Sequence, residues 1–222
     1  MYSQPRKEIM NLSSVMKTLL GAASLTLPIL AFAESNVQTG AATVTPGATA
    51  HVDFSIVIPQ VLYLRVGTGS SYTTGVYTAN STVDEIVFSP TAAQVGTGAA
   101  IAGTGGDLTA GVETAAVVSN YGNVTLNATA LGALNDGAAG DSIPFTQITT
   151  TASTLTSATA LPAPVLSNGT SANVVLTAPA SKVIVEDAKW TYSYANAAVV
   201  PGGTYGGVNV NNSRVVYTAT MP

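Results

Sequence analysis

Alternation of apolar and polar side chains is the feature that most limits what this chain can fold into. It is clearest along residues 50–58. The two faces of this stretch are Val52, Phe54, Ile56 and Ile58 on the apolar side, and His51, Asp53 and Ser55 on the polar side. A period of two residues is typical of a β-strand with one covered face. The pattern therefore predicts a strand over Ala50–Ile58.

The alternation resumes after a proline. Pro59 interrupts it, and over residues 61–66 three apolar side chains again oppose two polar ones. Proline cannot donate a backbone hydrogen bond, so within sheets it is confined to edges, bends and strand ends. We therefore expect residues 50–66 to form one long edge strand that bends or changes sheet at Pro59.

Short strand patterns separated by Gly, Pro, Asn and Ser fill the rest of the chain. The further predicted strands are Val83–Phe88, Val112–Ser119, Val124–Ala130, Phe145–Thr149, Asn173–Thr177, Lys182–Val185, Ala188–Tyr194, Tyr205–Val210 and Arg214–Thr220. Only 8% of the residues are charged, and no helical pattern lies between the strands. The sequence predicts an all-β fold, an antiparallel immunoglobulin-like β-sandwich of roughly nine to eleven strands.

The first 33 residues have the pattern of an export signal. Arg6, Lys7 and Lys17 precede the apolar stretch 19–33, which ends in Ala-Phe-Ala. A membrane anchor is the alternative, but this stretch is shorter than the roughly 20 residues that span a bilayer. We expect cleavage after Ala33 and a secreted or cell-surface protein, with translation starting at Met1, Met10 or Met16.

The predicted mature chain then divides into two parts. Residues 34–49 form an extension rich in small side chains, and residues 50–222 form a single sandwich domain. The Ser/Thr-rich segment 149–170, which contains Pro162 and Pro164, is an alternative domain boundary. The Gly-rich segment 96–111 is predicted to be a loop.

Charge and cysteine content exclude several function classes. The mature part keeps four basic residues against ten acidic ones, a formal charge of −6, so no basic patch is available to bind nucleic acid. The chain has no cysteine, which excludes disulfides, Cys-ligated zinc and thiol catalysis. Stability must therefore come from packing and backbone pairing.

No set of residues with the pattern of a catalytic site is found. The single histidine, His51, shares a strand face with Asp53, but no G-x-S-x-G nucleophile motif accompanies them, and an exposed edge-strand histidine is the favoured interpretation. The acid pairs 84–85 and 186–187 are interpreted as solvated loops, with calcium ligation as the alternative, and Asp136 and Asp141 come nearest to an acidic loop motif. We expect no enzyme activity, no metal and no cofactor.

The aromatic stretch 188–194 allows two interpretations. Trp190, Tyr192 and Tyr194 share one face, and Lys189, Thr191 and Ser193 share the other. An exposed aromatic face would make a platform for stacking a sugar ring, whereas a covered one would be the inner face of a sandwich strand with hydroxyls at its rim. The polar opposite face favours the core. Tyr205, after the turn at Pro201, is expected to tie a loop to a sandwich strand through its hydroxyl.

Three passages together resemble the immunoglobulin-like β-sandwich subunits of bacterial surface and fimbrial proteins. They are ATAHVDFSIVIPQVLYLRV at residues 48–66, SNYGNVTLNATA at 119–130, and the ending from WTYSYAN at 190–196 through GGTYGGVNVNNSRVVYTATMP at 202–222. The resemblance implies a non-enzymatic, self-associating or adhesive surface protein whose subunits join by strand exchange. The chain differs from chaperone–usher pilins in having no disulfide and no aromatic residue next to its C-terminus.

Two function hypotheses follow. The first is a structural subunit of an extracellular filament, pilus or surface layer, a homopolymer joined by β-strand addition, with Val37, Ala41 and Val44 of the N-terminal extension as the interface strand. A flexible lead, or pairing within its own domain, is the alternative role of that extension. The second is a secreted carbohydrate-binding or adhesive module that recognises surface glycans or a matrix through Trp190, Tyr192 and Tyr194, or through Tyr72 and Tyr77.

Overall fold

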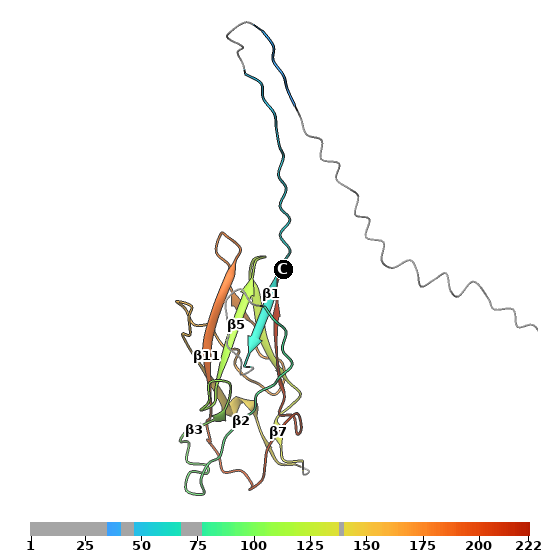
Figure 1. Ribbon diagram of the computed structural model, residues 1–222. Helices are drawn as coiled ribbons and strands as arrows, with labels where there is room; N and C mark the ends of the chain where they lie inside the picture. Colours follow the sequence, from blue (N-terminus) through green and yellow to red (C-terminus); the bar gives the residue numbers. More distant parts are fainter. Residues whose placement is uncertain (1–34, 41–46, 68–76, 138–139) are drawn as a thin grey trace, which may run out of the picture. The chain divides into compact units, whose positions relative to one another are not determined.

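A computed structural model describes residues 35–40, 47–67, 77–137 and 140–222 (Figure 1). The predicted export signal, the interface residues Ala41 and Val44, and Tyr72 lie outside the described residues. The chain divides into two compact units, Met1–Val57 and Ile58–Pro222. The division therefore falls at Val57–Ile58, inside the predicted strand Ala50–Ile58.

The second unit is an antiparallel β-sandwich, which confirms the predicted fold class. One sheet has the order β1 (Leu62–Val66), β5 (Val112–Ser119), β11 (Ile184–Tyr194), and β11 also pairs with β3 (Ile101–Ala102) and β9 (Ile148–Ser153). The other has the order β10 (Val174–Leu176), β6 (Val124–Ala130), β12 (Val215–Thr220). The remaining elements are the pairs β2 (Ile86–Val87) with β4 (Thr104–Gly105) and β7 (Leu134–Asn135) with β8 (Ser142–Ile143), and a 3₁₀ helix at Phe145–Gln147.

The core lies between the two larger sheets and is centred on β11. Trp190 is fully buried, and its Nε1 donates to the carbonyl of Leu161 at 2.8 Å. Its ring lies 5.3 Å from that of Tyr217 on the opposite sheet. The hydroxyls of Tyr192 and Tyr217 are 2.9 Å apart, so a hydrogen bond also joins the two sheets. The inward-facing orientation predicted for 188–194 is thus confirmed, although the Tyr192 hydroxyl lies in the core and not at the rim.

Several predicted strands have the bounds expected. Val112–Ser119 and Val124–Ala130 match to the residue, and the predictions over 61–66, 173–177 and 214–220 are one residue too long at one or both ends. The predictions Lys182–Val185 and Ala188–Tyr194 are parts of one strand. The intervening Glu186 and Asp187 therefore do not lie in a solvated loop, and Asp187 is buried.

Other strand predictions are wrong or reduced. Ala50–Ile58 forms no strand, and Val83–Phe88 keeps only two strand residues. Phe145–Thr149 begins as a 3₁₀ helix. Tyr205–Val210 is irregular because Gly206 and Gly207 have φ values of 88° and 127°, outside the range of a strand. The Gly-rich segment 96–111, predicted as a loop, contains β3 and β4.

The segment 149–170 packs on β11. Its first residues form most of β9, and Leu161 farther along is fully buried, with its N–H donating to the carbonyl of Asp187 at 3.0 Å. The Asp187 carboxylate accepts hydrogen bonds from the N–H groups of Thr156 and Ser157, both at 2.8 Å. The hydrogen bonds of Asp187 therefore hold segment 149–170 against the sheet.

Candidate functional site

The most unusual surface of the molecule is the stretch 50–58. Every residue from 47 to 58 is exposed, and none of them pairs with a described strand. Its apolar side chains have high exposed fractions: Val52 75%, Phe54 89%, Ile56 85%, Val57 90% and Ile58 75%. The strand-like alternation is present, but neither the apolar face nor the backbone is covered by the described part of the chain.

Such exposure is unfavourable for a protein that acts alone. Burying one side chain the size of Val, Ile or Phe stabilises by roughly 1.5–3 kcal/mol, and five of them lie within seven residues here. Scattered apolar residues on a surface are ordinary, but a contiguous group marks an interaction site. An extended segment at the edge of a sheet, or outside any sheet, is also a template for pairing with another strand. This stretch has the physical properties of a strand that pairs with a partner.

The chain directly after this stretch is held firmly at the end of the sandwich. Asn120 follows β5, and its side chain accepts from the N–H of Val61 at 2.8 Å and donates to the carbonyl of Pro59 at 2.8 Å. The Asn120 N–H donates to the Val61 carbonyl at 3.3 Å. These bonds continue the register of β1 and β5, in which Leu62 faces Ser119. The backbone at Pro59–Val61 is therefore fixed in the direction of β1.

A groove of about 640 Å³ lies at the other end of the sandwich. One wall is segment 83–90, which contains β2, and the other runs from Val200 to Arg214. Between them the groove is lined by apolar and aromatic side chains, including Leu134, Ile143, Phe145, Ile148 and Tyr194. Within segment 83–90, Ile86 and Phe88 are half-buried and pack against the core, whereas Val87 is exposed. The groove therefore has an apolar floor and one wall made by a short strand.

The strand in this wall has one edge that no described strand covers. Among the described strands, β2 pairs with β4 on its other side. The last strand, β12, pairs with β6 within the described sheets, and Ser213 and Arg214, which directly precede β12, line the groove. The apolar floor of the groove therefore lies beside β2.

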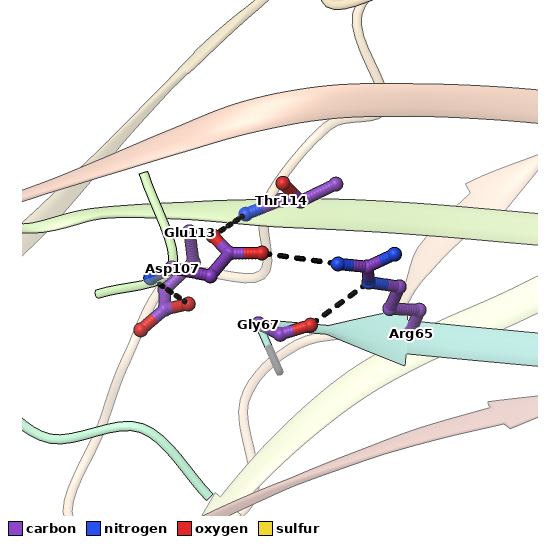
Figure 2. A network of polar contacts seen from close by, with 5 residues as sticks. All are labelled: Arg65, Gly67, Asp107, Glu113 and Thr114. Carbon is purple, nitrogen blue, oxygen red and sulfur yellow. Dashed lines mark hydrogen bonds and ion pairs between the residues drawn. The ribbon is translucent and has the colours of Figure 1, made fainter. Parts of the chain in front are cut away.

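A buried polar network lies between β1, β5 and segment 103–111 (Figure 2). The Arg65 Nη2 lies 3.2 Å from Asp107 Oδ2, and both side chains are nearly inaccessible. Arg65 also donates from Nε to the Gly67 carbonyl at 2.8 Å. Asp107 accepts from the Thr114 N–H at 2.7 Å, and its own N–H donates to the Glu113 carboxylate at 3.2 Å. Protein groups therefore partner these side chains, and the network fastens segment 103–111 to the sheet.

Glu113 is the electrostatically unusual member of this network. Burial raises its pKa to about 8, and the nearby carboxylates of Asp84 and Asp107 act in the same direction. Gly67 lies directly beside them, since an added Cβ would be 2.5 Å from Glu113 Oε2 and 2.6 Å from Asp84 Oδ2. The space between these carboxylates is therefore filled by the backbone, which suits a structural role better than ligand binding.

The aromatic residues of the glycan hypothesis lie mostly in the core. Trp190, Tyr192 and Tyr194 have exposed fractions of 0%, 7% and 7%, so they form no exposed platform, and this part of the hypothesis is wrong. Tyr77 is 42% exposed, and its ring packs 5.3 Å from that of Tyr63. Tyr205 makes the expected kind of hydrogen bond, from its hydroxyl to the Pro201 carbonyl at 2.8 Å, but within its own loop and not from a strand.

The remaining predicted residues are placed as follows. Val37 is 82% exposed, and His51 and Asp53 lie exposed on the polar side of stretch 50–58. Within the described ranges, no group of three or more His, Cys, Asp or Glu residues is arranged to hold a metal ion. No helix in those ranges is long and apolar enough to cross a membrane.

Sequence reasoning missed the groove and the role of Asn120. The groove is built from three segments that are far apart in the chain, and none of them carries a pattern that links it to the others. The signal for Asn120 was weak, since an Asn in a turn between two strands is common. The exposure of the apolar side chains in stretch 50–58 has no sequence signal, because their pattern is that of a core strand.

Comparison of the chain with known protein families, with curated proteins and with solved structures finds no match.

Proposed function

We propose that this protein is a non-enzymatic structural subunit of an extracellular filament, pilus or surface layer, and that its copies join by β-strand addition. One observation carries the proposal: the alternating stretch 50–58 exposes an apolar face and belongs to none of the described sheets. In β-strand addition, backbone hydrogen bonds supply affinity and alternate side chains fill pockets. Export follows from the predicted signal at residues 1–33.

The proposal moves the interface strand along the chain. The sequence favoured Val37, Ala41 and Val44, whose spacing of four and three residues does not keep one face of a strand. Stretch 50–58 keeps one face over four apolar residues. The proposed interface strand is therefore 50–58, and residues 34–49 are the N-terminal extension that precedes it.

A matched pair of variants tests this function. Phe54→Asp with Ile56→Asp adds two charges to the apolar face, and His51→Asp with Ser55→Asp adds two acidic side chains to the polar face of the same stretch. We expect the parent protein and the polar-face variant to form large assemblies in sedimentation velocity and electron microscopy, and the apolar-face variant to stay monomeric. A monomeric parent protein, or equal assembly of both variants, would contradict the proposal.

A further inference from the structure

We infer that the groove beside β2 and the start of β12 is the acceptor site for stretch 51–58 of a second copy of this chain. The inference rests on the proposed function, and it names the surface on which one copy binds the next. The groove would take the apolar side chains of the stretch, and the edge of β2 that no described strand covers would pair with its backbone.

The chemistry of the two surfaces is complementary. The groove has an apolar floor that includes Leu134, Ile143 and Phe145, and the stretch presents four apolar side chains on one face. Its volume of about 640 Å³ falls within the range of roughly 300–1,000 Å³ found for sites that enclose ligands. Eight extended residues span about 26 Å, which is long enough to place side chains in the groove and backbone along the strand edge beside it.

Charge agrees with this assignment. The polar face of the stretch carries the carboxylate of Asp53. The groove is lined by the cationic side chain of Arg214. An opposite charge is therefore present on the groove for the polar face of an added strand.

The occupant is a second copy because of how the chain leaves the sandwich. Asn120 fixes Pro59–Val61 in the direction of β1, at the end of the sheet where Leu62 faces Ser119. The groove lies at the opposite end of this sheet. It is lined by Tyr194 of β11, which lies just beyond Thr191, the residue that pairs with Val112 at the start of β5. A return into the groove of the same copy would need a chain reversal at Pro59–Val61, and this would break the bonds to Asn120.

Disulfide trapping tests the assignment cleanly because the chain has no cysteine. One full-length variant carries Ser55→Cys. A second full-length variant carries Ser89→Cys at the groove and a tag that gives it a different mass, so that mixed dimers can be recognised. The matched control carries Val175→Cys, an exposed residue of β10 outside the groove. After mixing and oxidation, we expect a mixed disulfide dimer with Ser89→Cys at least tenfold more abundant than with Val175→Cys.

The alternatives give different results. Equal trapping at Ser89→Cys and Val175→Cys, in a protein that does assemble, overturns the acceptor site and leaves the proposed function standing. The double variant Ser55→Cys/Ser89→Cys tests the same-copy arrangement. A monomer with an internal disulfide, with no dimer in the mixture, shows that the stretch occupies its own groove and overturns the inference.

A peptide of residues 51–59 separates failure of the site from failure of the function. We expect it to reduce assembly of the parent protein, and the same peptide with Phe54→Asp and Ile56→Asp to have no effect. If the parent protein proves monomeric, the proposed function fails. Saturable binding of labelled peptide to the full chain carrying Phe54→Asp and Ile56→Asp then still supports the groove, and absence of that binding overturns it.

Discussion

Residues 52–58 and residues 188–194 have the same sequence pattern and opposite surroundings. Both carry apolar side chains at every second position over seven residues, and each places its largest aromatic side chain on that face. Phe54 is 89% exposed, whereas Trp190 is completely buried. Alternation therefore specifies which side of a strand is apolar, and it does not specify which element covers that side.

The strands that pair with residues 188–194, and the sheet that buries their aromatic face, come from distant parts of the chain. β5 pairs along one edge of β11 and β9 along the other, and the sheet containing β12 covers the aromatic face. For residues 52–58 the described chain supplies neither a paired edge nor a covering face. The first region stabilises one copy of the protein, and the second is proposed to stabilise the assembly. Free energies of unfolding can separate these two roles.

The largest expected effect is at Trp190. Trp190→Ala should lower the free energy of unfolding by about 3–5 kcal/mol, because it leaves a cavity in the core and the Leu161 carbonyl without its donor. Urea unfolding followed by circular dichroism measures this loss. Thr191→Ala on the exposed face of the same strand is the control, with an expected change below about 0.5 kcal/mol. A loss below about 1 kcal/mol for Trp190→Ala would show that the core does not depend on this strand.

A somewhat smaller effect is expected at Asp187, on the opposite face of β11. Asp187→Ala removes a charged acceptor of the Thr156 and Ser157 N–H groups and should cost roughly 2–3 kcal/mol. Thermal unfolding at pH 7 measures it. Asp187→Asn keeps an acceptor oxygen and should lose less, so an equal loss for the two variants would contradict this role.

The pH dependence of this contribution has a definite sign. Burial alone would raise the pKa of Asp187, but the hydrogen bonds from Ser157 and Thr156 outweigh it and hold that pKa below its ordinary value of 3.8. The folded state therefore favours the ionised form. The contribution is complete above pH 3.8 and is lost as the pH falls through the lowered pKa.

How far the sequence predicts this molecule depends on where the partner of each segment lies. β5 and β6 were predicted to the residue because each is rich in β-branched and small residues and the turn between them contains Asn120 and Gly122. β11 was divided in two because Glu186 and Asp187 indicate a loop when read alone. The groups that make Asp187 favourable in a strand lie 30 and 31 residues away.

The candidate site shows the same limit more strongly. The apolar face of residues 52–58 was identified from the sequence, and so was the possibility of strand addition. The sequence did not show that no described element covers this face, because an exposed strand and a core strand have the same alternating pattern. The groove could not be predicted either, since Ile86, Phe145 and Arg214 meet only through the pairing of distant strands.

An effect that depends on pH is expected at Glu113, which faces Trp190 in the register of β5 and β11. Its pKa of about 8 lies above the ordinary value of 4.5, so the folded state favours the protonated form. Its contribution is complete below pH 4.5, decreases as the pH rises, and is lost above pH 8.

The variant Glu113→Gln isolates this group from its neighbours. Asp84, Asp107, Arg65, Tyr192 and Tyr217 all lie near it and stay unchanged. The melting temperature of the parent protein should fall more steeply between pH 5 and 8 than that of Glu113→Gln. Parallel curves for the two proteins would show that Glu113 is ionised in the folded state.

The smallest expected effect on the single copy is at Phe54, and it completes the contrast with Trp190. In dilute solution Phe54→Asp should change the free energy of unfolding by less than about 0.5 kcal/mol, because its side chain contacts mainly water. The melting temperature of the parent protein should rise with protein concentration, since a partner that binds only the folded state stabilises it. That rise should be absent in Phe54→Asp and retained in Ser55→Asp. Destabilisation of dilute Phe54→Asp by more than about 1 kcal/mol would mean that the single copy covers this face, and the contrast with Trp190 would no longer hold.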